Sequence, residues 1–146
     1  MKKIPLLINA LLIPFLAWSA HAQPIITAEK IWIREAPPTI DVLAAYMTLH
    51  NPTDQDITLI CVKSPAFTDI MFHKTEIVND IAKMRHADEI IIPAHTSFDL
   101  APGGFHMMLM GKKYQLKKGD EVELTLIFKK INNKKIIATV KKSITD

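Results

Sequence analysis

Residues 121–128 (EVELTLIF) alternate between polar and apolar side chains, and their apolar members are Val122, Leu124, Leu126 and Phe128. Side chains of a β-strand point alternately to its two faces, so this period of two predicts a strand with one buried face. Short apolar runs recur along the chain between turn residues, at 25–33, 42–49, 57–62, 67–72, 77–84, 89–92, 97–100, 105–110 and 136–144. Short strands at such a spacing predict an all-β, antiparallel sandwich or barrel.

One of these runs, residues 42–49 (VLAAYMTL), has a composition that would also suit a helix. The turn-forming sequence Asn51-Pro52-Thr53-Asp54 follows it, and the β-branched, apolar run 57–62 comes next. Turn residues between two such runs favour a β-hairpin. Since the chain contains no internal repeat, low-complexity tract or linker, we expect one domain.

Residues 1–22 have the features of a secretory signal peptide. Lys2 and Lys3 precede an apolar run, and Ala20-His21-Ala22 forms a small-x-small cleavage site before Gln23. The apolar run is interrupted and falls short of the about 20 apolar residues that span a bilayer. No cysteine stands at the cleavage site to carry a lipid anchor. We therefore expect an exported, periplasmic mature protein, residues 23–146, without a membrane anchor.

The charge of the chain is partly that of the signal segment. The chain has 18 Lys and Arg and 15 Asp and Glu, and the signal segment holds two of the lysines and no acid. The mature chain is therefore close to neutral, but lysines crowd its last third, at positions 112, 113, 117, 118, 129, 130, 134, 135, 141 and 142. We expect a solvated face in which edge-strand lysines discourage association between strands, with a docking face for an acidic partner as the alternative. The lysines lack interleaved aromatic residues, which argues against nucleic acid as a partner.

Cys61 is the one cysteine of the chain, so an internal disulfide is excluded and the fold must depend on its core. It lies inside the apolar run 57–62, where we expect a small buried thiol.

Residues 102–110 (PGGFHMMLM) combine a turn with an imidazole and three thioethers. In a strand, His106 and Met108 point to one face and Met107 points to the other. Imidazole and thioether form a soft pair of donors that suits Cu(I) better than Mg²⁺, Ca²⁺ or Mn²⁺. For this step alone, methionine packing in a core is the better explanation of the pattern.

His73 and Met84 lie at the ends of the runs 67–72 and 77–84. If these runs pair through a turn near residues 78–80, His73 and Met84 come close together. For either residue taken alone, a structural role is the better explanation.

Ten residues separate His73 from Met84, twenty-one separate Met84 from His106, and one separates His106 from Met108. This spacing resembles the signature of the PCu(A)C family of periplasmic copper chaperones. Further residues share the resemblance over nearly the whole mature chain: Trp32-x-Arg34, Ala44-Ala45-Tyr46-Met47-Thr48-Leu49, Pro102-Gly103-Gly104-x-His106, and Gly119-Asp120 before Leu124-Thr125-Leu126-x-Phe128.

The resemblance implies a cupredoxin-like Greek-key β-sandwich that binds one Cu(I) through His73, Met84, His106 and Met108. It also implies delivery of copper to partner proteins, for assembly of the copper-A centre of a haem-copper (cytochrome c) oxidase, often with a Sco-type thioredoxin-like protein. Some family members carry a His- and Met-rich C-terminal tail with a second copper site. This chain ends in Lys141-Lys142-Ser143-Ile144-Thr145-Asp146, so we expect a single site in a monomer.

Other donors share the expected strand faces. Met71 and His86 lie two residues from His73 and Met84, and Met110 lies two residues after Met108. We expect core packing or surface exposure for these three, with a supporting or substitute role as the alternative. His50 and His95 have the sequence surroundings of turn residues.

Several competing functions remain. A blue-copper electron carrier needs a cysteine thiolate, and Cys61 is far in sequence from His106 and Met108. No enzyme is expected, because the chain has no GxSxG, no HExxH and no glycine-rich phosphate loop. A metal-free exported sandwich for adhesion or interaction is the rival from another class, and copper storage or detoxification is the rival within the copper class.

Overall fold

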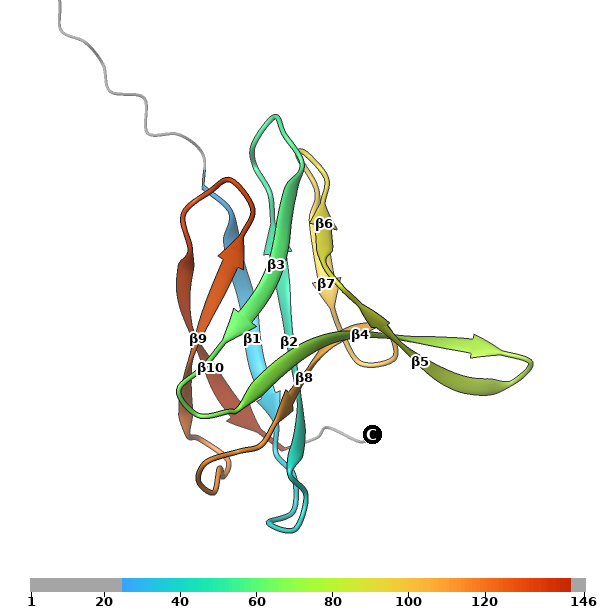
Figure 1. The fold of residues 1–146 in the computed structure, drawn as a ribbon, viewed down its shortest axis with the longest axis vertical. Helices are drawn as coiled ribbons and strands as arrows, with labels where there is room; N and C mark the ends of the chain where they lie inside the picture. Colours follow the sequence, from blue (N-terminus) through green and yellow to red (C-terminus); the bar gives the residue numbers. More distant parts are fainter. Residues whose placement is uncertain (1–24, 143–146) are drawn as a thin grey trace, which may run out of the picture.

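The computed structural model describes residues 25–142, which form ten β-strands and no helix (Figure 1). The strands are β1 (Thr27–Arg34), β2 (Val42–His50), β3 (Ile57–Lys63), β4 (Asp69–Val78), β5 (Ile81–Ala87), β6 (Ile90–Ile92), β7 (Ser97–Leu100), β8 (Phe105–Met110), β9 (Glu121–Phe128) and β10 (Lys134–Lys141). They pair in the order β5-β4-β8-β2-β1-β10-β9-β3-β6, and β7 pairs with β2. The all-β prediction is confirmed, although the sheet is mixed because β1 and β10 are parallel.

The predicted alternation of residues 121–128 appears directly in β9. Val122, Leu124, Leu126 and Phe128 are buried, and the residues between them are partly exposed or exposed. In β10 the buried side chains are Ile136, Ala138 and Val140, and both strands contribute to the same hydrophobic core. This core has no covalent cross-link, since Cys61 is free.

The position of β10 corrects the interpretation of the C-terminal lysines. Lys134, Lys135 and Lys141 lie in a strand that is flanked by β1 and β9, so they do not protect an edge. The strand at one end of the pairing order is β5, and it carries Lys83 and Arg85 instead. The spacing of lysines in the sequence could not reveal this, because strand order depends on long-range pairing.

Residues 42–50 form a strand, as predicted, but the predicted hairpin with residues 57–62 is wrong. β2 pairs with β1 on one side and with β7 and β8 on the other, whereas β3 pairs with β9 and β6. The segment between β2 and β3 is therefore a crossover between two parts of the sheet.

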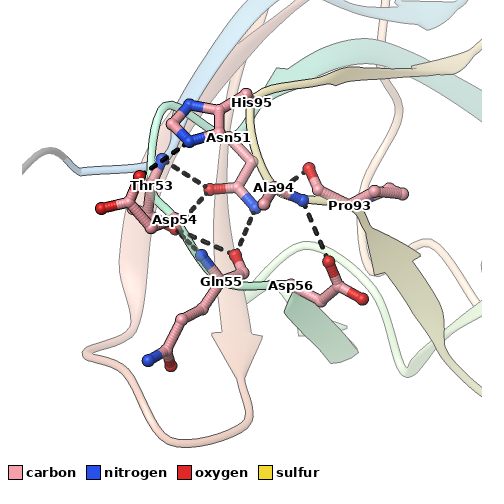
Figure 2. Close-up of polar contacts among 8 residues, drawn as sticks. All are labelled: Asn51, Thr53, Asp54, Gln55, Asp56, Pro93, Ala94 and His95. Carbon is pink, nitrogen blue, oxygen red and sulfur yellow. Dashed lines mark hydrogen bonds and ion pairs between the residues drawn. The ribbon is translucent and has the colours of Figure 1, made fainter.

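Asn51 fixes this crossover (Figure 2). Its side chain is fully buried, and Nδ2 donates to the carbonyl oxygens of Gln55 at 2.8 Å, Ile92 at 2.9 Å and Pro93 at 3.1 Å. Its Oδ1 accepts from the backbone N–H of Thr53 at 3.0 Å and from the Thr53 hydroxyl at 2.7 Å. One amide thus joins the end of β2, the crossover and the end of β6, which gives buried carbonyl groups the partners that they need.

Asn51→Ala is expected to lower the free energy of unfolding by about 2–3 kcal/mol, because the buried carbonyl of Ile92 loses its donor. Gln55→Ala is the matched control, since Gln55 contributes only its backbone carbonyl and its side chain is exposed. Equilibrium unfolding in urea measures both. Equal losses in the two variants would contradict a specific role for the Asn51 amide.

Cys61 is half-buried, so the predicted buried thiol is wrong. The register between β3 and β9 shifts between Leu59 and Cys61. This bulge places an extra residue on β3 and interrupts the alternation, which leaves Ile60 exposed and Cys61 partly so.

β4 and β5 form a long hairpin that extends away from the other strands (Figure 1). Val78 pairs with Ile81, and the two residues between them, Asn79 and Asp80, have φ values of 53° and 60°. A two-residue turn with both φ values positive matches the twist of a hairpin, and Asn and Asp tolerate this conformation. The predicted turn is confirmed, but β4 continues past His73 to Val78 and β5 continues past Met84 to Ala87, so the two residues lie within their strands and not at the ends.

No helix among residues 25–142 is long and apolar enough to cross a membrane. The predicted signal segment and the last four residues of the chain lie outside the described residues.

Candidate metal site

The site lies next to the connection between β7 and β8, where the chain moves away from β2. β7 and β8 both pair antiparallel with β2: Leu100 is opposite Met47, and Met107 is opposite Ala45. Residues 101–106, between them, leave β2. The Pro102-Gly103-Gly104 turn makes this departure possible, since Gly103 has a φ of 81° and the N–H of Gly104 donates to the carbonyl of Ala101 at 3.0 Å.

The end of this segment, Phe105 and His106, continues into β8, which pairs with β4 along its whole length. His106 is directly opposite His73, and Met108 is directly opposite Met71. Residues directly opposite each other in an antiparallel pair project to the same face. His73, His106 and Met108 therefore share one face, whereas Phe72, Met107 and Leu109 are buried on the other.

Contacts on this face bring the donors together. Nδ1 of His73 lies against Sδ of Met108, and the rings of His73 and His106 are 6.1 Å apart between centroids. His106 is buried, and its Nδ1 donates to the carbonyl of Gly104 at 3.1 Å. This hydrogen bond orients the ring and leaves Nε2 with the lone pair that a metal ligand needs.

Met84 lies at the rim of the same face. It is opposite Thr75, so it is a diagonal neighbour of His73, and 65% of it is exposed. The structure thus gathers His73, His106 and Met108 closely and places the exposed Met84 beside them on β5.

The surroundings of His73 favour its neutral imidazole. Burial lowers the pKa of His73 below its ordinary value near 6.5, because it disfavours the charged ring, and the nearby His106 and His86 rings lower it further. Cationic side chains of this hairpin point to the opposite face, where Lys74 and Arg85 pair with Glu76 at 3.0 and 3.2 Å. No cation of β4 or β5 therefore competes with a metal ion for this face.

The donor set limits the chemistry. Among residues 25–142, no three His, Cys, Asp or Glu side chains converge to hold a metal ion, so a site here depends on thioethers as well. Cys61 lies on β3 and faces a hollow that it shares with residues 67–70, and none of His73, His106 and Met108 lines this hollow. A cleft of about 580 Å³ between residues 53–58 and residues 129–131 is lined by no histidine or methionine.

The arrangement can be compared with known proteins. The family model for putative lipoproteins of the LpqE-like type matches residues 26–140. The chain belongs to the LpqE-like family, which is the PCuAC-like family. The resemblance inferred from the sequence is thereby confirmed.

Two relatives match by sequence. A putative lipoprotein of Leifsonia xyli subsp. xyli is 31% identical over 104 residues, and an uncharacterized protein of Rickettsia prowazekii is 33% identical over 111 residues. Each match covers 70% of this chain, and the chain spans about three fifths of the length of these relatives, 61% and 60%.

Solved PCuAC structures have the same fold. The copper-bound PCuAC domain from PmoF2 is 29% identical, with a TM-score of 0.70, over 84% of this chain and 97% of that domain. The solution structure of CuI-DR1885 from Deinococcus radiodurans is 36% identical, with a TM-score of 0.68, over 86% of this chain and 83% of that one. The predicted cupredoxin-like β fold is confirmed.

The sequence predicts core packing or surface exposure for Met71 and His86, yet the register places both on the face that carries His73 and Met108. Met71 is opposite Met108, and His86 is opposite His73. Half of the His86 side chain is exposed. The signal that could have found His86 is the Asn79-Asp80 turn, since pairing Val78 with Ile81 sets every later pair of the hairpin.

The lowered pKa of His73 predicts the pH dependence of the metal-free protein. The unfolded chain binds a proton on His73 more readily than the folded chain, so stability is fully present above about pH 6.5 and falls as the pH drops below it. His73→Asn is expected to flatten this dependence between pH 7 and 5. Urea unfolding across that range tests it, and equal slopes in wild type and variant would contradict it.

Proposed function

We propose that this protein is a periplasmic Cu(I)-binding metallochaperone that binds one Cu(I) through His73, Met84, His106 and Met108. The observation that carries the proposal is the meeting of His73, His106 and Met108 on one face of β4 and β8. The copper-bound PmoF2 domain and CuI-DR1885, which have this fold, support it.

The chemistry of the donors suits such a cargo. Cu(I) is soft, and it accepts thioether and neutral imidazole ligands. Methionine requires no deprotonation and forms no disulfide in an oxidising compartment. A site of neutral donors leaves the charge of the ion uncompensated, which favours its transfer to a cysteine-containing acceptor.

The position of the site favours release as well as binding. His106 is buried and oriented by Gly104, whereas Met84 is largely exposed on β5. An acceptor can replace the exposed thioether first, while the buried ligands still hold the ion. The protein acts by transfer and performs no catalysis in this proposal.

The proposed acceptors are the oxidase subunit that carries the copper-A centre and a Sco-type thioredoxin-like protein. Export through residues 1–22, with cleavage after Ala22, would bring the chaperone to them, and the putative lipoproteins among its relatives support an exported location. Storage or detoxification of copper differs from delivery in one measurable respect, because it requires no transfer to such an acceptor.

An anaerobic titration with Cu(I) against a chromophoric chelator tests the binding site. The mature wild type is expected to take up one equivalent, and Met108→Leu is expected to weaken binding about 10-fold or more, because a soft ligand is lost. Met107→Leu is the matched control, since Met107 is buried on the opposite face and the same side chain is exchanged.

Equal affinities for these two variants would remove Met108 from the site. No uptake by the wild type would contradict the chaperone and storage proposals together, and would favour a metal-free exported sandwich. Loss of Cu(I) from the loaded protein to a copper-A domain, followed by absorbance, then separates delivery from storage.

A further inference from the structure

Three histidines stand in one row across three neighbouring strands. His86 on β5 is directly opposite His73 on β4, and His73 is directly opposite His106 on β8. All three therefore project to the face that carries Met84 and Met108. The row contains one imidazole more than the donor set of the proposed Cu(I) site.

The ring of His86 is as close to His73 as the ring of His106 is. The centroids of His73 and His86 are 5.6 Å apart, compared with 6.1 Å for His73 and His106. An imidazole nitrogen binds a first-row metal at about 2.0–2.1 Å, so two rings that share an ion have centroids roughly 6 Å apart or less. Each pair is thus spaced to share an ion, and His73 belongs to both pairs.

β5 thus places two different metal donors beside His73. Met84 is a diagonal neighbour of His73, and His86 is its direct neighbour. The three rings do not converge on one point in this structure, but the His86 side chain is 51% exposed and can rotate without loss of core packing. Its Nε2 lies 3.3 Å from Oδ1 of Asp88, which places a carboxylate next to the ring.

We infer that His86 is a further copper ligand, which replaces Met84 when the bound ion is Cu(II). This inference rests on the proposed function, because it extends the same site. With Met84 the donors are two imidazoles and two thioethers, a set that suits Cu(I). With His86 they are three imidazoles and one thioether, and imidazole suits Cu(II) better than thioether does. The carboxylate of Asp88 adds a negative charge beside the ion of higher charge.

The inference predicts opposite changes in selectivity for two variants of β5. His86→Gln is expected to lower the affinity for Cu(II) about 10-fold or more, and by a larger factor than the affinity for Cu(I). Met84→Leu is expected to lower the affinity for Cu(I) by the larger factor. Competition titrations measure both, with a chromophoric chelator under anaerobic conditions for Cu(I) and with glycine as competitor for Cu(II).

Electron paramagnetic resonance of the Cu(II)-loaded protein supplies a second readout. His86→Gln is expected to remove one coordinated nitrogen from the hyperfine pattern. His95→Gln is the matched control, because His95 is an exposed histidine that also lies beside an aspartate, Asp54, at 2.7 Å. The control should retain the affinities and the spectrum of the wild type.

The outcomes separate this inference from the proposed function. If the wild type takes up Cu(I) but His86→Gln keeps its Cu(II) affinity and spectrum, or if the wild type binds no Cu(II), the role of His86 is overturned and the chaperone proposal stands. If the wild type takes up no Cu(I), the proposed function fails, and the Cu(II) titration then decides the role of His86 alone.

Discussion

The pairing between β4 and β8 is the interaction on which the site depends. β8 pairs with β4 along its whole length but with β2 only from Met107 to Met110, and the pairing with β4 places His106 opposite His73. Backbone hydrogen bonds, and not the donors themselves, thus bring the two imidazoles together. The ion does not have to order the backbone around it. Folding has already removed that conformational entropy, so ion binding does not lose it again.

The two faces of β4 and β8 have different roles. Phe72, Met107 and Leu109 pack into the core, whereas His73 and Met108 on the same strands face outward. Strict alternation therefore lets consecutive residues of β8 serve packing and binding separately. The adjacent thioethers Met107 and Met108 show why a count of methionines says little until the face of each one is known.

Much of the fold could be predicted from local patterns. The alternation in residues 121–128 and the Asn79-Asp80 turn depend on neighbouring residues, and both predictions are confirmed. The predicted hairpin between residues 42–49 and 57–62 is wrong, because the buried Asn51 amide joins segments that are far apart in the sequence. The edge position expected for Lys134 and Lys135 failed for the same reason, since strand order is set by long-range pairing. The grouping of His73 with His106 became visible in the sequence only through a family resemblance, and register supplies its physical cause.

The two-residue turn of the β4–β5 hairpin has a consequence for sequence variation. Because Asn79 and Asp80 fix the register, inserting or deleting one residue there would turn the donors of β5 to the other face of the sheet. The interval between His73 and Met84 is therefore rigidly constrained in length. The interval between Met84 and His106 contains β6, β7 and their connections, where loops can absorb insertions while the ends stay in place. The ten-residue spacing of the signature therefore follows from one turn, whereas the twenty-one-residue spacing depends on several connections.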